Sequence, residues 1–449
     1  SIHKVYENTE AEHAEVLKRC AALIETAAEK LLRQEKDAVT VLNTLSYDYT
    51  SPVRLPDEWA GCSVTDESGR EILTQTENGA LWALGNFPPQ SFTTLTRGKA
   101  SGSVKAGVDK ALVLENDLVR YEFDSDARLL RAFDKTANRE VVCGAAGNLL
   151  GLYVDEPNNW DAWDVDFTYQ DVPPVYVTGS RAEKVAAGPV RQVLEFELAV
   201  DKSKIRQQVV LAANSKRLDF NTEVDWNEHH RMLRVTFPTA IRAAEARCDI
   251  QYGYITRPTH RNTLWDFARF EVAAQRYVDI ADANGGAALL NDCKYGYKLL
   301  DGVLDLNLLR SPENPDPEAD LGHHSFTYSF LPHEGGLVGS EVIQEAACLN
   351  RAPLVLPGRS EALMLPCRLV GGAGASLEVL KLAYKRDERI IRVVETDGCN
   401  STARLALEPG RKLVETNLVE WSSGMTLNQE DGVVEIPLKP FEIRTFRIR

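Results

Sequence analysis

The 449-residue sequence predicts a mainly β protein organised around a large antiparallel β-sandwich. From Val39 onward, short runs rich in β-branched and aromatic residues are separated by turn residues, which is the pattern of strands. These runs do not alternate with helical segments, so the βαβ rhythm of a parallel sheet is absent. Only the N-terminal segment has the period of a long amphipathic helix. A chain of this length forms roughly three domains.

The first predicted element is a helix within residues 1–38. Leu17, Ile24 and Leu31 recur every seven residues, with charged residues at the outer positions. A capping-box pattern at Thr9 predicts where the helix begins. One helix cannot bury its own apolar stripe, so we expect it to be the last helix of a bundle whose other helices come from elsewhere. The chain is therefore expected to be a fragment of a longer protein.

Turn-rich and glycine-rich stretches divide the rest of the chain. We predict a small β domain at residues 39–106, a β super-sandwich at 107–376 and a C-terminal β domain at 377–449. Two stretches, Ser101–Gly107 and Gly371–Ser376, are interpreted as linkers. The clearest strand patterns lie at Val193–Val200, Ile205–Leu211, Leu218–Val224, Leu233–Phe237, Leu377–Tyr384, Ile390–Glu395, Ala403–Leu407, Val433–Ile436 and Phe441–Ile448, with a proline-rich loop at Ser311–Asp320.

Composition excludes several classes of partner. The formal net charge of −15 disfavours nucleic acid, because phosphate binding draws on clustered Lys and Arg. No run of about 18 apolar residues offers a membrane span, and Ser1–Glu12 lacks the apolar core of a signal peptide. The eight cysteines form no CxxC or CxxxC pair. This scatter favours separate thiols in a reducing compartment, hence a cytoplasmic location, while leaving room for one or two bridges.

The segment Asn158–Tyr169, reading NNWDAWDVDFTY, is the strongest candidate for a binding site. Flat tryptophan faces beside fixed carboxylates suit a sugar, whose ring has an apolar C–H face and a rim of hydroxyls. The alternative is a loop in which the tryptophans plug the end of the sandwich and the aspartates cap backbone N–H groups. Composition alone leaves both interpretations open.

Common catalytic and metal-binding motifs are missing. The sequence contains no GxSxG elbow, HExxH helix, P-loop or GxGxxG fingerprint. The adjacent pairs His229-His230 and His323-His324 would point to opposite faces of a strand, so neither pair makes a two-ligand metal site. We therefore predict no metal site and no cofactor within this chain.

Several segments resemble a known enzyme family. Ala146–Asp166 reads AGNLLGLYVDEPNNWDAWDVD and Leu308–Gly335 reads LLRSPENPDPEADLGHHSFTYSFLPHEG. Both are similar to parts of the α-mannosidases of glycoside hydrolase family 38, in the cytosolic and bacterial branch. The same resemblance extends to Val41–Pro56, Arg257–Ile280, Leu289–Leu299 and Pro440–Arg449.

The resemblance implies a retaining, multi-domain enzyme with an α/β catalytic domain, a helical bundle and an all-β C-terminal half. The zinc ion and catalytic aspartates of the family belong largely to the first part. Ser1–Tyr6 resembles the stretch that follows the last zinc-binding histidine, and His3 is not that ligand. No catalytic or metal-binding residue is therefore assigned to this chain. Zinc is expected in the missing catalytic domain, and the isolated chain is expected to be inactive.

The leading hypothesis is a C-terminal segment of an α-mannosidase that supports and rims the active site of an enzyme that hydrolyses terminal α-mannosidic bonds. Trp160, Asp161, Trp163 and Asp164 are its candidate substrate-binding residues. The expected partners are an oligosaccharide with terminal α-mannose, the chain's own N-terminal catalytic domain and, in a homo-oligomer, a second copy. Neither nucleic acid nor a membrane is expected.

Two alternatives belong to other functional classes. The super-sandwich resembles galactose-mutarotase-like folds, so the segment could epimerise a sugar by itself, with His260, His323, His333 and Glu334 as acid/base candidates. A carbohydrate-binding module without chemistry is the other alternative. Independent chemistry requires a histidine and a carboxylate that converge in one pocket.

Overall fold

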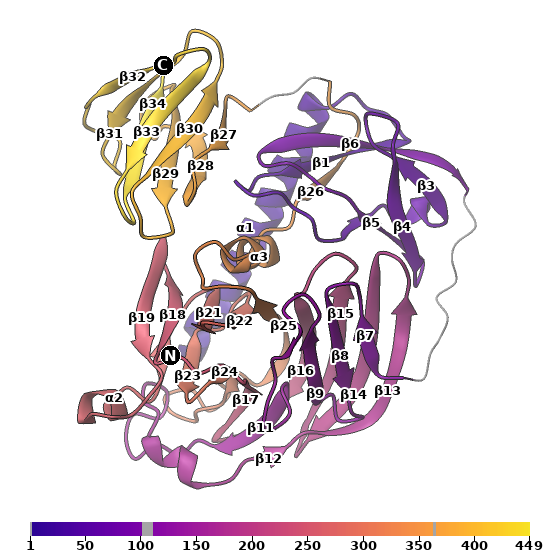
Figure 1. Ribbon diagram of the computed structural model, residues 1–449, viewed down its shortest axis with the longest axis vertical. Helices are drawn as coiled ribbons and strands as arrows, with labels where there is room; N and C mark the ends of the chain where they lie inside the picture. Colours follow the sequence, from indigo (N-terminus) through magenta and orange to yellow (C-terminus); the bar gives the residue numbers. More distant parts are fainter. Residues whose placement is uncertain (1, 101–110, 362–364) are drawn as a thin grey trace.

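The computed structural model describes residues 2–100, 111–361 and 365–449. It is mainly β, and the paired strands among these residues are antiparallel, which confirms the predicted fold class. Figure 1 shows a small β domain, a large sandwich and a C-terminal β domain, with one long helix behind them. The predicted linker Ser101–Gly107 lies outside the described residues.

The long helix α1 (Ile2–Leu31) begins before the predicted capping box. Thr9 lies inside the helix, where its hydroxyl donates to the carbonyl oxygen of Val5 at 2.8 Å, so the predicted start was wrong. The apolar residues Leu17, Ile24 and Leu31 are exposed, and Ala28 is the buried residue of the helix. The predicted apolar stripe is thus present without a partner among the described residues.

The small β domain is one seven-stranded sheet in the order β2-β5-β4-β3-β6-β1-β26. β26 (Leu354–Pro357) falls within the predicted 107–376 range, yet it pairs with β1 across some 300 residues of chain. Trp59, Phe87 and Leu95 are buried in its core. Its other elements are β1 (Ala38–Asn43), β2 (Val53–Leu55), the short helix η1 (Asp57–Trp59), β3 (Cys62–Thr65), β4 (Glu71–Glu77), β5 (Ala80–Leu84) and β6 (Ser91–Ala100).

The super-sandwich contains a nine-stranded, a six-stranded and a four-stranded sheet. β16 (Leu218–Trp226) illustrates why its strands form, because buried and more exposed residues alternate along its length. Its core is rich in aromatic pairs, such as Phe220 and Tyr328, whose ring centroids lie 5.0 Å apart. The nine-stranded sheet runs β13 (Thr178–Ala187), β14 (Arg191–Val200), β15 (Ser203–Ala212), β16, β25 (Gly322–His333), β22 (Gly285–Asn291), β21 (Tyr277–Asp282), β18 (Glu245–Ile250) and β19 (Gly253–Pro258).

The six-stranded sheet positions the candidate site. It runs β12 (Val175–Tyr176), β11 (Leu149–Val154), β17 (Arg231–Pro238), β24 (Val303–Arg310), β23 (Gly296–Leu300) and β20 (Val272–Ala273). The four-stranded sheet runs β10 (Arg139–Glu140), β9 (Leu129–Asp134), β8 (Val119–Phe123) and β7 (Val113–Glu115). The helical segments of this region are η2 (Phe167–Asp171), α2 (Leu264–Ala268) and α3 (Val342–Asn350).

The C-terminal domain packs two sheets around one core. Gly372 and Gly374 have φ of +116° and +68°, so the stretch Gly371–Ser376 forms a tight turn between two strands of this domain instead of the expected linker. The sheets run β27 (Cys367–Gly371), β30 (Ser401–Leu407), β33 (Val433–Leu438) and, in the second sheet, β28 (Ala375–Leu382), β29 (Arg389–Glu395), β34 (Ile443–Ile448), β31 (Lys412–Thr416), β32 (Thr426–Asn428).

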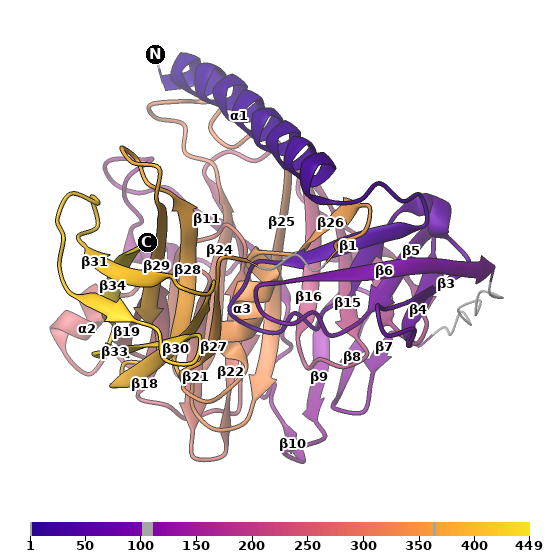
Figure 2. The same cartoon turned by 90° about the horizontal axis from the view of Figure 1, so that it is seen from above.

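Three loops of the super-sandwich meet at one of its ends. They follow β11, join β16 to β17 and join β24 to β25. The N-terminal end of α1 lies beside the third loop, because His3 Nδ1 is 3.8 Å from Asp316 Oδ2. In Figure 2 α1 lies along one side of the molecule, with its N-terminal end toward loops of the super-sandwich. The helix and the three loops therefore share one side of the structure.

Candidate functional site at the rim of the sandwich

The rim loop, residues 155–166, displays two exposed tryptophans. Trp160 and Trp163 are 72% and 71% exposed. The backbone N–H groups of Trp163 and Asp164 donate to the carbonyl oxygen of Trp160, at 2.7 and 2.9 Å. Trp160 has a φ of +62°, which is unfavourable for a bulky residue and persists where the surroundings fix the backbone. The loop therefore holds both indoles in a defined turn.

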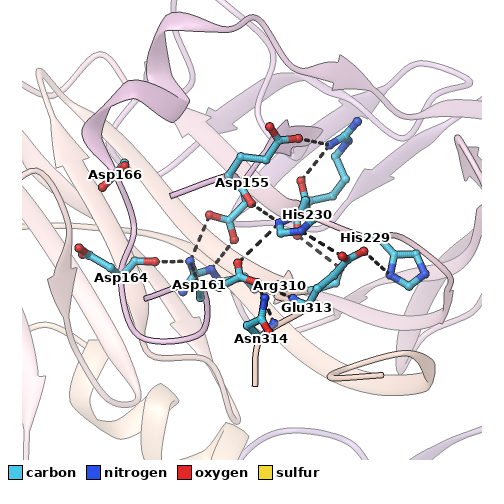
Figure 3. A network of polar contacts seen from close by, with 12 residues as sticks. Asp155, Asp161, Asp164, Asp166, His229, His230, Arg310, Glu313 and Asn314 are labelled. Atoms are coloured by element: carbon cyan, nitrogen blue, oxygen red, sulfur yellow. Dashed lines mark hydrogen bonds and ion pairs between the residues drawn. The ribbon is translucent and has the colours of Figure 1, made fainter. Parts of the chain in front are cut away.

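Arg310, at the end of β24, fixes this loop through an ion pair and hydrogen bonds, which Figure 3 draws as dashed lines. Its guanidinium pairs with the Asp155 carboxylate, and its Nη2 also donates to the carbonyl oxygens of Asp161, at 3.0 Å, and of Asp164. Asp155 is 1% exposed, and burial raises the pKa of its carboxyl group, against the opposing effect of Arg310. One arginine thus ties the start and the middle of the loop to the sheet.

Asp161 joins the rim loop to the neighbouring 311–320 loop. Its Oδ2 accepts hydrogen bonds from the backbone N–H groups of Glu313 at 2.7 Å and Asn314 at 2.8 Å. Its side chain is only 11% exposed, and its Oδ1 lies 3.6 Å from His230 Nδ1. The carboxylate is therefore engaged inside the protein, which is the loop-fixing role that the alternative interpretation gave to the aspartates.

Two histidines complete the contact between the loops. His229 Nδ1 lies 3.2 Å from one carboxylate oxygen of Glu313, and His230 Nε2 lies 3.3 Å from the other. These contacts become ion pairs when the imidazoles are protonated. The backbone N–H of Asp155 donates to the carbonyl oxygen of His230 at 2.9 Å. Figure 3 shows both rings on either side of Glu313.

Asp164 and Asp166 of the rim loop differ in whether their carboxylates bind other parts of the loop. Asp166 accepts a hydrogen bond from the backbone N–H of Asn158 at 2.6 Å and closes the loop. Asp164 is exposed, and its Oδ1 accepts one bond, from the N–H of Val165 at 2.9 Å. Asp164 therefore keeps acceptor capacity toward solvent beside Trp160 and Trp163.

A buried charged network under η2 was not predicted. Arg234 is 1% exposed and donates to Asp305 Oδ1 at 2.8 Å and to Glu271 Oε2 at 3.1 Å. The Tyr169 hydroxyl donates to the other oxygen of Glu271, and Lys298 pairs with Asp305 at 3.0 Å. Burial raises the pKa of the Glu271 carboxyl and of the Tyr169 hydroxyl. The sequence signal for this network was Arg234, a charged residue within the apolar run of β17.

The acid/base candidates of the epimerase alternative do not converge. His333 is fully buried and lies 2.6 Å from Asp279, whereas His323 is exposed and lies 3.0 Å from Asp225. These histidines occupy opposite ends of the 12-residue strand β25, roughly 30 Å apart. The other candidates, His260 and Glu334, lie beside Asp266 and Lys216, respectively. His323 lines a cavity together with Glu223 and Asp225, and His260, His333 and Glu334 are not among the residues that line it.

Within residues 2–100, 111–361 and 365–449, no three His, Cys, Asp or Glu side chains gather so as to hold a metal ion. Over these ranges no helix has both the length and the apolar character needed to cross a membrane. All eight cysteines carry free thiols.

Comparison with known families adds the decisive observation. The model of the glycosyl hydrolases family 38 C-terminal domain matches residues 114–318, and that of the family 38 C-terminal beta sandwich domain matches residues 374–446. The chain belongs to glycosyl hydrolase family 38, as the C-terminal part of its members. The rim loop lies inside the first matched range of this family 38 chain.

Named relatives agree with the assignment to family 38. The chain is 35% identical over 401 residues to alpha-mannosidase G of Dictyostelium discoideum, covering 85% of this chain and 36% of the relative. It is 36% identical over 345 residues to human alpha-mannosidase 2C1, covering 75% and 33%. An alpha-mannosidase structure from Enterococcus faecalis shares the fold, with a TM-score of 0.70, 17% identity and coverage of 93% of this chain and 57% of that one. The family 38 chain spans about a third of the length of these curated relatives.

Proposed function

We propose that this chain is the C-terminal part of an α-mannosidase that hydrolyses terminal α-mannosidic bonds with retention of configuration. The observation that carries the proposal is the ordered match to both family 38 C-terminal models, together with relatives named alpha-mannosidases. The substrate is an oligosaccharide with terminal α-mannose. The catalytic carboxylates belong to an N-terminal domain outside this chain.

Zinc belongs to the same N-terminal domain in this proposal. A catalytic zinc ion needs three protein ligands in tetrahedral arrangement. Among residues 2–100, 111–361 and 365–449, no three His, Cys, Asp or Glu side chains gather in a way that could hold such an ion. No step of the reaction is assigned to a metal bound here.

The role of this chain is to support the catalytic domain and to form part of the substrate rim. The exposed apolar residues of α1, such as Leu17 and Leu23, supply a surface for the other helices of a bundle. At the rim, Trp160 and Trp163 would stack on the sugar ring and Asp164 would accept its hydroxyl hydrogens. Asp161 acts through its contact with the 311–320 loop and is a positioning residue.

Compartment and assembly remain predictions. We assign the protein to the cytoplasm on the spacing of its cysteines. A homo-oligomer formed with a second copy of the chain stays a prediction.

Two measurements test the proposed function. The protein encoded by the complete reading frame should hydrolyse an aryl α-mannoside and contain zinc by elemental analysis, whereas this chain alone should do neither, because retaining hydrolysis needs two carboxylates roughly 5 Å apart. One equivalent of zinc in the isolated chain, or turnover by a preparation free of host mannosidase, would overturn the assignment. An inactive complete protein would refute the α-mannosidase itself.

A further inference from the structure

The C-terminal sandwich carries an apolar surface that the rim does not explain. We call it the apolar tip, formed by the loop that joins β28 to β29 and the loop that joins β31 to β32. Six large apolar side chains on and beside these loops are between 54% and 81% exposed. They are Leu382, Tyr384, Leu418, Val419, Trp421 and Met425.

The two loops of the apolar tip are fixed to each other. The Glu420 carboxylate accepts a hydrogen bond from the backbone N–H of Tyr384 at 2.8 Å and pairs with Lys381. Asn417 Oδ1 accepts the backbone N–H of Trp421 at 2.9 Å. The exposed rings of Tyr384 and Trp421 are thus displayed by a defined backbone.

A buried arginine supports the tip from inside. Arg447 is 0% exposed, and its Nη2 donates to the Ser422 carbonyl oxygen and to the Ser423 hydroxyl. Thr416 Oγ1 donates to the same Ser422 carbonyl at 2.8 Å. Because the backbone of this loop is already fixed, a partner that binds its apolar side chains loses little free energy to ordering the loop.

The chemistry of the tip fits a protein surface better than a sugar. A sugar platform presents free polar groups beside an aromatic ring. Next to Trp421, the Glu420 carboxylate is engaged by Lys381 and the N–H of Tyr384. The large exposed side chains near it in the loop, Leu418, Val419 and Met425, are apolar. Aromatic residues and methionine are enriched in protein interfaces, and exposed apolar patches mark such contacts. Lys385 Nζ lies 5.6 Å from the Trp421 ring and 5.7 Å from the Tyr384 ring, which adds one cation at the centre.

We propose that the apolar tip is a docking surface for the N-terminal catalytic part of the same enzyme. The inference rests on the proposed function, since the curated relatives are about three times as long as their matched region. In Figure 2 the loops that join β28 to β29 and β31 to β32 both point toward the side on which α1 lies. One large domain placed on that side would cover the exposed stripe of α1 and the tip together.

Hydrogen exchange tests the docking surface. Backbone amides of residues 417–425 should exchange at least roughly 10-fold more slowly in the complete protein than in this chain alone. The exposed strand residue Leu130 of β9 lies in another domain and provides a reference that should not change. Equal exchange at the tip in both proteins would refute the proposal.

Two further exchange measurements distinguish the catalytic part from other ligands of the apolar tip. Protection that appears in this chain only as its concentration rises would assign the tip to a second copy, and protection by a mannose oligosaccharide would assign it to a sugar. Either result overturns the proposal. In the complete protein, Trp421→Ala should reverse most of the protection, whereas Leu130→Ala should leave it in place.

The readout is independent of mannoside hydrolysis. A complete protein that is inactive but protected at the tip would refute the proposed activity alone. An active enzyme whose tip exchanges as fast as in the isolated chain would refute the docking surface alone.

Discussion

The rim loop and the apolar tip are held in place in the same way but expose different kinds of surface. Each is a surface loop with an exposed indole, and each is held by an arginine that donates to at least one backbone carbonyl oxygen. Arg310 holds the rim loop and pairs with the buried Asp155. Arg447 holds the tip, and its Nε lies 3.8 Å from Glu388.

The side chains around the indoles distinguish the two loops. Trp163 in the rim loop is followed by the exposed acid Asp164, whereas Trp421 at the tip follows the exposed Leu418 and Val419. Carboxylates beside an aromatic face suit hydroxyl groups, and aliphatic carbons beside it suit another apolar surface. An exposed tryptophan therefore identifies a contact surface, and its neighbours identify the class of ligand.

Removing Arg310 should have the largest effect on stability. Arg310→Ala leaves the buried Asp155 carboxylate without its cation and frees two loop carbonyls. Breaking a buried ion pair costs about 3–5 kcal/mol, so the free energy of unfolding should fall by about this amount in chemical denaturation followed by circular dichroism.

An exposed pair provides the control for this substitution. Arg181 is 53% exposed and lies 3.2 Å from Glu197, so Arg181→Ala should change the free energy of unfolding by about 1 kcal/mol or less. If both substitutions produce the same small loss, Arg310 does not lock the rim loop.

The two aspartates of the rim should separate kinetics from stability. In the complete enzyme, Asp164→Asn should lower kcat/KM roughly 10- to 100-fold, because a lost hydrogen bond to a charged acceptor costs about 1.5–3 kcal/mol. Asp161→Asn should instead lower the free energy of unfolding by about 1–3 kcal/mol, since two backbone N–H groups lose a charged acceptor. Both quantities are measured on the same purified variants. A stability loss at Asp164 without a kinetic loss would remove it from the rim.

The contrast between these aspartates marks the limit of sequence reasoning at the site. The composition of Asn158–Tyr169 indicated a binding loop, but two aspartates three residues apart are indistinguishable in a sequence. Their roles depend on Arg310 and on the 311–320 loop, which approach from about 150 residues away. Such contacts are set by sheet pairing, which local patterns do not encode.

The fold shows the same division between local and long-range information. Strands with strong alternation, such as β16, could be predicted because their burial has a period of two. β31 and β32 escaped prediction because they are short and flanked by polar residues. The pairing of β1 with β26 is a contact across most of the chain. Local patterns therefore could not show that β26, which lies inside the predicted range 107–376, belongs to the sheet of the small β domain.

The indoles of the rim should contribute a smaller kinetic effect than Asp164. An aromatic contact adds about 0.5–1.5 kcal/mol, so Trp163→Ala should lower kcat/KM about 2- to 10-fold in the complete enzyme. Trp163→Phe should recover most of the loss, because it keeps an aromatic face. Neither variant should shift the melting temperature, since the side chain is largely exposed. Leu130→Ala is the matched surface control, and an equal kinetic loss there would refute the stacking role.

The smallest expected effect is a difference in how the two loops respond to acid. The pKa of Glu420 at the tip is lowered, mainly by the hydrogen bond from Lys381 and to a smaller extent by that from the backbone N–H of Tyr384. A carboxyl group whose pKa is lower in the folded protein stabilises it above the ordinary glutamate pKa of about 4.3, and this contribution is lost as the pH falls through the folded value. Burial instead raises the pKa of Asp155 at the rim, so the folded protein takes up that proton more readily and acid removes no stability there.

Melting temperatures of wild type, Glu420→Gln and Asp155→Asn between pH 7 and pH 3 check this difference. The advantage of wild type over Glu420→Gln should be present at pH 7 and correspond to about 1 kcal/mol, since the Lys381–Glu420 ion pair is partly exposed. It should shrink toward zero as the pH falls below about 4.3. The stability of wild type relative to Asp155→Asn should not decline over the same range, because protonation of Asp155 is favoured by folding. A wild-type advantage over Glu420→Gln that stays constant with pH would mean that Glu420 holds the tip by shape and not by charge.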